Sequence, residues 1–450
     1  MVTQVRPGGG PEKTTAAKST EAAKKVSRII RQYYIQVQEA AQNGEPIAWC
    51  MNGGMGAGPY EIRRALGIHS LYPEHYATVC SAKQVGMPLI EVAEGDGYAN
   101  YTCSYARIGL GYASQMEEQG AVPPDAAWGG MPRPRFLIGR GFCEPGYKWF
   151  QAFASYLKVP VFVFDNKRPA PDIDYDDKEI ARRHIQFYKG QIMSLVDFLE
   201  KQLGKKIDWD VVREFMVRHH KARWLWDQVH QIRKNIPCPM PSGDKFSVMF
   251  PAQYMMGTQE AIDFFQGLYD ELQDRVKRGV GVIPDEKYRL LFVGIPQWHA
   301  MNFFNYLESL GAVSVIDSMY YNLAFDEVDM SDPLTALATR YYQDYTKKLK
   351  MGRLISGVGD ERVGFNMVLA RDYKVDGAIV HLIQSCRPNA IGMIQLSHLL
   401  REHLGVPVFF LESDICDARV ASEAEVQMKA REFVATVDSY KEKRLREGRA

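Results

Sequence analysis

Apolar residues recur at intervals of three and four between Ala23 and Gln42 and form one apolar face, namely Val26, Ile29, Ile30, Tyr33, Tyr34 and Val37. This spacing predicts an amphipathic helix. Residues 1–22, in contrast, are rich in Gly, Pro, Thr, Ala and Lys and hold almost no large apolar side chain. Because such a segment cannot offset the entropy lost on ordering, we expect a disordered arm before the helix.

Farther along the chain, short apolar segments typical of buried strands alternate with helical segments. Strands are expected at 46–51, 135–140, 159–165, 288–296, 312–317, 378–384 and 406–412, and helices at 61–66, 147–157, 302–310 and 393–403. This alternation is typical of parallel sheets with crossover helices.

Residues 177–280 break the alternation, because their pattern is mainly helical. We therefore predict an α/β protein with two related Rossmann-like parallel-sheet units, a helical N-terminal segment and a helical insertion between the units. The expected divisions are an arm at 1–22, a helical lead-in and first α/β domain at 23–176, the helical segment at 177–280, and a second α/β domain with a C-terminal helix at 281–450.

The two units share a motif. FLIGRGFCEPGYKWFQAFASYLKVPVFVFDN (136–166) and AIVHLIQSCRPNAIGMIQLSHLLREHLGVPVFFLESD (378–414) both run strand, Cys, Pro two residues later, helix, and a Val-Pro-Val-Phe strand. The pattern suggests an internal duplication, although any two βαβ units share some periodicity. It places Cys143 and Cys386 at the carboxyl ends of parallel strands, where open α/β sheets bind ligands.

Composition narrows the function classes. Hydrophobic residues make up 46% of the chain, and 55 Lys and Arg balance 54 Asp and Glu for a formal charge of +1. A nucleic-acid-binding protein usually carries a basic excess, so we do not expect a nucleic-acid partner. No apolar run reaches the roughly 18–20 residues of a bilayer span, and the first residues lack a secretory signal. We therefore expect a cytoplasmic protein with no membrane contact.

Seven cysteines stand at wide spacing without any C-x-x-C pair, which argues against a structural zinc site and a thioredoxin-type dithiol. Cys103, Cys143 and Cys386 each lie at a segment junction beside Gly or Pro. Widely spaced thiolates are compatible with an iron–sulfur cluster, in which three ligands would leave one iron open. Each could instead be a small buried hydrophobic residue.

The motifs CSYARIGLG, GMGAGPYEIRRALG (54–67), SCRPNAIG and VPVFFLESDICDAR resemble the family of 2-hydroxyacyl-CoA dehydratases and the active-site subunits of ATP-dependent benzoyl-CoA reductases. The resemblance extends from about residue 45 to residue 434. It implies that Cys103, Cys143 and Cys386 hold one [4Fe-4S] cluster.

The segments SLYPEHYATVCSAKQVG and EGDGYANYTCSYAR resemble the benzoyl-CoA reductase branch, and within it the larger cluster subunit. This resemblance implies a related smaller cluster subunit, two ATP-binding activator subunits that take ATP and Mg²⁺, reduced ferredoxin as electron donor, and benzoyl-CoA as substrate. The chain itself contains no G-x-x-x-x-G-K-[ST] motif for ATP. A dehydratase subunit and a non-catalytic electron-relay subunit are the alternatives.

Several other residues have two interpretations each. The loop GGMGAGP (53–59) could let the backbone approach a CoA thioester or could form a tight turn, and Glu61 could serve a pocket or favour a helix start. Four histidines could be proton donors or ordinary structural residues, namely His69, His75, His299 and His381. A second group could form a surface for a partner or for CoA, or could lie on an amphipathic helix that packs its tryptophans inward; it comprises His219, His220, Trp224 and Trp226. Among the remaining cysteines, Cys50, Cys80, Cys238 and Cys416, only Cys416 lies near a strand end, so it alone is a spare candidate ligand.

Overall fold

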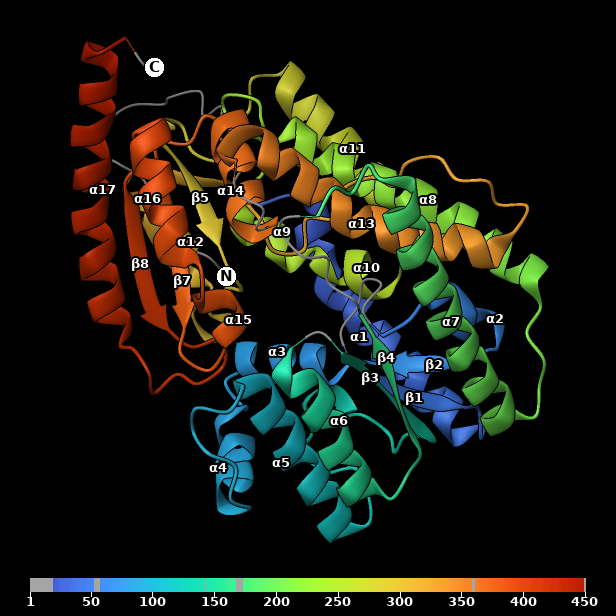
Figure 1. Ribbon diagram of the computed structural model, residues 1–450. Helices are drawn as coiled ribbons and strands as arrows, with labels where there is room; N and C mark the ends of the chain where they lie inside the picture. The colour runs from blue at the N-terminus through green and yellow to red at the C-terminus, as the bar shows by residue number, and fades with distance from the viewer. Residues whose placement is uncertain (1–18, 52–56, 142, 167–172, 358–360, 449–450) are drawn as a thin grey trace.

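The computed structural model describes residues 19–51, 57–141, 143–166, 173–357 and 361–448. Within them it contains two four-stranded parallel sheets flanked by helices, which confirms the predicted α/β class (Figure 1). The first sheet holds β1 (Ile47–Cys50), β2 (His69–Leu71), β3 (Phe136–Gly141) and β4 (Val161–Asp165). The second holds β5 (Tyr288–Val293), β6 (Ala312–Asp317), β7 (Gly377–Ile383) and β8 (Val408–Ser413).

Both sheets have the same strand order. The first runs β2-β1-β3-β4 and the second β6-β5-β7-β8, so in each unit the second strand in the chain lies at an edge and the first and third are central. Cys143 follows β3 and Cys386 follows β7, which are equivalent strands. The shared order is what an internal duplication would produce.

The first helix, α1 (Glu21–Gln42), begins just inside the segment expected to be a disordered arm. Its start is fixed by buried Thr20, whose hydroxyl accepts a hydrogen bond from the N–H of Ala23 and whose own N–H donates to Asp244 at 2.7 Å. Such a cap satisfies helix N–H groups that have no partner within the helix. Residues 1–18 of the predicted arm lie outside the described residues.

The helical segment between the sheets consists of α7 (Lys178–Leu203), α8 (Trp209–Ile232), α9 (Ser242–Ser247), α10 (Met249–Tyr254) and α11 (Gln259–Lys277). Two helices that the pattern did not predict, α13 (Pro333–Ser356) and α14 (Glu361–Asp372), lie between β6 and β7 in the chain and pack on each other. The other helices are α2 (Tyr60–Ala65), α3 (Pro73–Ala82), α4 (Met87–Gly95), α5 (Ser104–Gln119), α6 (Glu144–Leu157), α12 (Asn302–Ser309), α15 (Arg387–Ala390), α16 (Met393–Leu404) and α17 (Glu423–Arg446).

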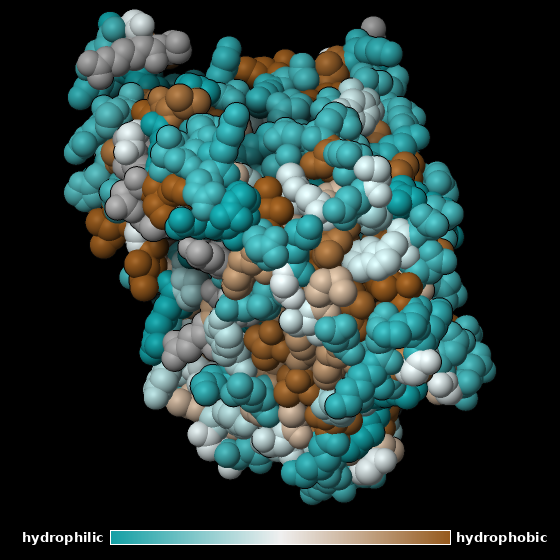
Figure 2. Space-filling model, turned by 45° about the vertical axis from the view of Figure 1, so that its right-hand side comes forward, coloured by the Kyte–Doolittle hydropathy of each residue, from teal (hydrophilic) through white to brown (hydrophobic). Residues whose placement is uncertain are grey.

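On the face shown in Figure 2, apolar residues occur in groups interrupted by hydrophilic ones. Among the described helices, none combines the length and apolar character needed to cross a bilayer.

The glycines of the CSYARIGLG motif allow close helix packing. A Cβ at Gly111 would lie 1.9 Å from the carbonyl oxygen of Leu89 in α4, and one at Gly109 would lie 2.7 Å from the ring of Trp149 in α6. Helix α5 therefore approaches both neighbours more closely than any side chain would permit, and this contact fixes the helix that begins just after Cys103.

We expect Gly111→Ala to lower the free energy of unfolding by about 1–3 kcal/mol, because the obstructing atom is backbone and cannot rotate away. The matched control is Gly190→Ala in α7, where nothing lies within 4 Å of the added Cβ. That change should raise the free energy of unfolding by about 0.4–1 kcal/mol, because alanine restricts the conformations of the unfolded chain. Chemical denaturation measures both, and equal effects of the two substitutions would contradict the packing argument.

Candidate functional site

A cavity of about 600 Å³ lies where the carboxyl edges of the two sheets face each other. Residues at or just beyond the ends of seven strands line it: Met51, Cys143, Asn166, Gly294, Ser318, Ser385 and Ile415. Open α/β sheets bind ligands at this edge, and here two such edges share one cavity.

The structure places Cys103, Cys143 and Cys386 in the lining of this cavity. Each is half-buried and each occupies the N-cap position of a helix, Cys103 before α5, Cys143 before α6 and Cys386 before α15. The sequence pattern predicted that Cys143 and Cys386 occupy equivalent corners of the two units, each at the carboxyl end of a parallel strand. The helix that begins after Cys103 gives this residue the same local arrangement.

Burial raises the pKa of all three thiols, to about 11 at Cys143 and well above the ordinary value at Cys103. Ionisation of Cys386 or Cys143 would raise the pKa of Cys103 further, because like charges repel. The thiols are therefore neutral near pH 7, and a bound metal would have to displace their protons.

Among the described residues, no three His, Cys, Asp or Glu side chains are placed to hold a single metal ion. A cluster makes a different demand, because its cysteines bind separate irons and their sulfurs lie farther apart than the ligands of one ion. Three thiols that meet at one cavity fit that demand.

Hydrogen bonds join the two corners that carry Cys103 and Cys386. The hydroxyl oxygen of Ser385 accepts a hydrogen bond from the N–H of Ser104 at 3.2 Å, and the N–H of Ser385 donates to Asp414 at 3.1 Å. Asp414 also accepts the N–H groups of Cys416 and Asp417, both at 3.1 Å. The side chains of Ser104, Ser385 and Asp414 are buried, so water does not compete for these contacts.

Arg107 holds the segment before Cys103 from the other side. Its guanidinium is 1% exposed, donates to the carbonyl oxygen of Thr102 at 3.0 Å, and pairs with Glu94 at 2.6 Å and Asp417 at 3.0 Å. The DICD segment thus supplies two carboxylates that orient neighbouring backbone.

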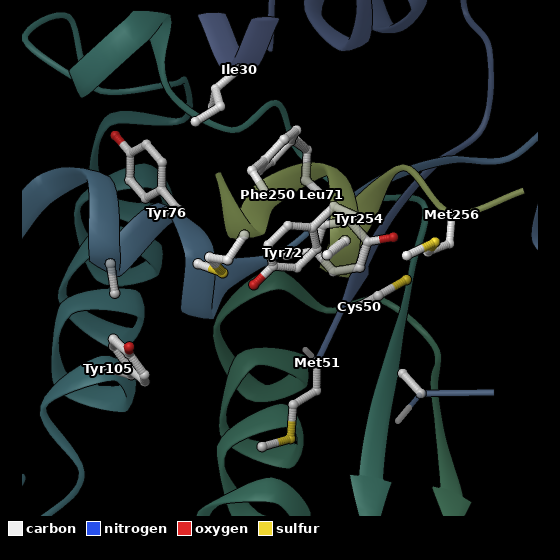
Figure 3. Packing of buried hydrophobic residues seen from close by; sticks show 14 of the residues in the cluster. Ile30, Cys50, Met51, Leu71, Tyr72, Tyr76, Tyr105, Phe250, Tyr254 and Met256 are labelled. Atoms are coloured by element: carbon white, nitrogen blue, oxygen red, sulfur yellow. The ribbon is translucent and has the colours of Figure 1, made fainter. Parts of the chain in front are cut away.

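The four other cysteines are buried and none of them lines the cavity. The thiol of Cys416 lies 3.9 Å from the carbonyl oxygen of Ala77, which gives this spare candidate a structural contact. Cys50 belongs to the cluster of buried apolar residues drawn in Figure 3.

Aromatic side chains make up much of the cavity wall. They are Tyr98, Tyr101, Tyr105, Trp149, Tyr188, Tyr320, Tyr341, Tyr345 and Phe365. Buried polar atoms without a hydrogen-bond partner accompany them, namely Nε1 of Trp149, Nε2 of Gln253 and Oδ1 of Asn366. A ligand in the cavity could satisfy these atoms and stack on the rings.

Glu74, in the first turn of α3, also lines the cavity. Burial raises its pKa to about 7, while the charge of Arg140 opposes the rise. This side chain can therefore hold a proton near neutral pH. Glu74 was not among the residues that the sequence indicated, and the only signal was a Pro-Glu pair at a strand-to-helix junction, which is also typical of an ordinary helix start.

None of the candidate histidines lines the cavity. His75 accepts or donates one hydrogen bond with the Tyr34 hydroxyl, and His381 uses both ring nitrogens on Ile295 and Ser413. Burial lowers the pKa of His75 to about 3 and that of His381 to about 4.

The other two candidate histidines are less buried. His69 pairs with Glu45 at the surface, and His299 is half-buried with a lowered pKa. The structure favours the structural interpretation for these residues.

Glu61 also lies outside the cavity, because its carboxylate is 2% exposed and joins α2 to two other helices. It pairs with Nδ1 of His219 in α8 at 2.8 Å and lies 3.7 Å from Arg340 in α13. Burial alone would raise the pKa of Glu61, but His219 and Arg340 outweigh it and hold the pKa at about 2.

The tryptophan pair of α8 divides between core and surface. Trp226 is fully buried and its Nε1 donates to the carbonyl oxygen of Tyr320 at 3.0 Å, whereas Trp224 is 45% exposed.

In the glycine-rich loop 53–59, residues 53–56 lie outside the described residues. Gly58 has φ +80°, and a Cβ there would lie 2.4 Å from Leu195, which favours the tight-turn interpretation at that position.

The fold and the cavity define a two-unit α/β protein with a cavity between its sheets that three cysteines line. A family model described as 2-hydroxyglutaryl-CoA dehydratase, D-component, matches residues 57–435, and the chain belongs to this family. The match confirms the family resemblance seen in the motifs.

Three relatives illustrate the range of the family. The chain is 28% identical to the (R)-phenyllactyl-CoA dehydratase alpha subunit of Clostridium sporogenes, covering 86% of this chain and 88% of the relative. It is 25% identical to the (R)-2-hydroxyisocaproyl-CoA dehydratase alpha subunit of Clostridioides difficile, covering 94% and 97%. It is 27% identical to the B subunit of benzoyl-CoA reductase from Thauera aromatica, covering 79% and 81%. The chain is thus similar, at 25–28% identity, to subunits of both dehydratases and a reductase.

We expect Glu61→Gln to lower the free energy of unfolding by about 3–5 kcal/mol at pH 7, because it leaves a buried arginine without its carboxylate. The folded pKa of about 2 lies below the ordinary 4.5, so the stability that ionised Glu61 contributes is present above pH 4.5 and is lost as the pH falls through 2. Denaturation midpoints across this range should fall less steeply in the variant than in the unmodified chain.

Glu45→Gln is the control, since it removes a carboxylate from the exposed His69 pair. This substitution should change the free energy of unfolding by about 0.5 kcal/mol or less. An equally small effect of Glu61→Gln would contradict the buried network.

Proposed function

We propose that this chain is the iron–sulfur subunit of an ATP-dependent benzoyl-CoA reductase, with one [4Fe-4S] cluster bound by Cys103, Cys143 and Cys386. The observation that carries the proposal is that three cysteines, each at the N-cap position of a helix, line one cavity between two sheet edges. The absence of any other described cysteine from that lining supports the choice of these three. When bound, the cluster supplies single electrons at low potential.

The side chains around the cysteines suit an aromatic acyl-CoA. The tyrosine, tryptophan and phenylalanine rings of the wall can bind an aryl group, and the buried donors on Trp149 and Gln253 can bind a carbonyl oxygen. Reduction of a ring also consumes protons, and Glu74 is placed to hold one at the cavity. The product would be a cyclohexadiene-carbonyl-CoA, as in anaerobic aromatic degradation.

Other chains would supply the driving force. We propose a related smaller cluster subunit, two activator-type subunits that bind ATP and Mg²⁺, and reduced ferredoxin as the cytoplasmic electron donor. The relatives support a multisubunit assembly, because each is named as one subunit of an enzyme.

A dehydratase of an aryl 2-hydroxyacyl-CoA is the second candidate. The specific observation in its favour is the similarity to the (R)-phenyllactyl-CoA dehydratase alpha subunit, whose coverage of both chains exceeds that of the reductase relative. The aromatic wall would suit that substrate also. A relay subunit without substrate is less favoured, since relay does not explain an aromatic cavity at the cysteines.

The assay compares the two chemistries on the anaerobically purified complex. The proposal expects ATP-dependent oxidation of a low-potential dye on addition of benzoyl-CoA, with formation of a cyclohexadiene product. Loss of water from (R)-phenyllactyl-CoA after activation, with no dye oxidation by benzoyl-CoA, would establish the dehydratase instead.

The ligand set has its own test in Cys103→Ala, Cys143→Ala and Cys386→Ala. Each variant should lose most of its iron and acid-labile sulfide and its EPR signal, because two thiolates are not enough to hold the cluster. Cys416→Ala is the matched control, since Cys416 is buried nearby but absent from the lining, and it should keep the full content. A full cluster in all three alanine variants would refute the assignment.

A further inference from the structure

Cys386 has a hydrogen-bond donor that the other two cavity cysteines lack among the described residues. The side-chain Nδ2 of Asn389 donates to the Cys386 sulfur at 3.1 Å. No side-chain donor to the sulfur of Cys103 or Cys143 occurs among the described hydrogen bonds. The three cysteines are therefore equivalent in position but not in their surroundings.

Each of the three sulfurs also has a backbone N–H group nearby, so the side-chain donor is what distinguishes Cys386. The N–H group three residues on lies near each sulfur and favours its anionic form, from Ala106 at Cys103, Gly146 at Cys143 and Asn389 at Cys386. Two of these three positions have no side chain that could donate, since they are Ala and Gly. Only the third combines a backbone N–H with a side-chain amide.

Local structure fixes the Asn389 amide in place. Helix α15 is a single turn with Pro388 near its start, and the N–H of Asn389 donates to the carbonyl oxygen of Cys386 at 3.2 Å. Gly392, at φ +89°, then separates α15 from α16. Asn389 is half-buried and lines the same cavity as Cys386.

We propose that Asn389 is a positioning residue that raises the reduction potential of the cluster through its hydrogen bond to Cys386. This inference rests on the cluster assignment in the proposed function. Reduction adds one negative charge that the ligand sulfurs share, and an N–H donor stabilises the more negative state. Hydrogen bonds to charged acceptors are stronger than those between neutral groups, so the contact strengthens on reduction.

The test is a redox titration of the complex, followed by EPR, with Asn389→Leu and Asn389→Asp. Leu removes the donor, and Asp keeps the size of the side chain while it replaces the donor with a carboxylate. Both variants should make the reduced form about tenfold less favourable relative to the oxidised form, which lowers the reduction potential by about 59 mV for a one-electron couple. The decrease in potential should be larger for Asp than for Leu. The matched control is Asn322→Leu, since Asn322 also lines the cavity and has no described contact with a cysteine sulfur. Its potential should match that of the unmodified complex.

Two results would refute the role of Asn389, and a third would refute the proposed function. Clusters with an unchanged potential in both Asn389 variants would refute the role of Asn389 and leave the proposed function intact. Loss of the cluster from both variants, with retention in Asn322→Leu, would assign Asn389 to assembly and also refute tuning. Absence of any cluster from the unmodified complex would refute the proposed function itself.

Discussion

The carboxyl edges of two parallel sheets face each other, and every other feature of the site depends on that meeting. Each edge alone presents the end of a strand and the start of a helix. The hydrogen bond between Ser104 and Ser385 joins one edge to the other, and Asp414 and Arg107 hold the adjoining segments. Because these groups are buried, small displacements of either unit would break charged or hydrogen-bonded contacts that water cannot replace.

Burial also sets the chemical state of the site. It keeps the three thiols neutral in the absence of a cation, and it places Glu74 near its midpoint of ionisation at neutral pH. Elsewhere, buried charges hold the helical segment in place. Lys245 and Arg233 pair with Asp317 at the end of β6, and His219 of α8 pairs with Glu61 of α2, which also lies near Arg340 of α13. The end of β6 is thus held by the helical segment outside the cavity.

The strand pattern and the paired Cys-x-Pro corners were predictable, because strands buried on both faces appear as apolar runs. Strand β2 was not, since His69–Leu71 is short and half polar. Helices α13 and α14 were also missed, and with them Tyr341 and Asn366 of the cavity wall. Long-range partners such as Ser104 with Ser385 leave no local pattern, so the hydrogen bonds that align the cysteines could not be predicted. Similarly, Glu61 and His381 have ordinary local surroundings, and only tertiary packing shows that they are structural.

Mössbauer spectroscopy of the ⁵⁷Fe-enriched complex tests the central claim most directly, because it distinguishes irons by their ligands. We expect four irons assigned to this chain, three with a thiolate ligand and one with a different signal that changes when an aromatic acyl-CoA is added. Four equivalent irons, or no iron on this chain, would contradict the cluster assignment.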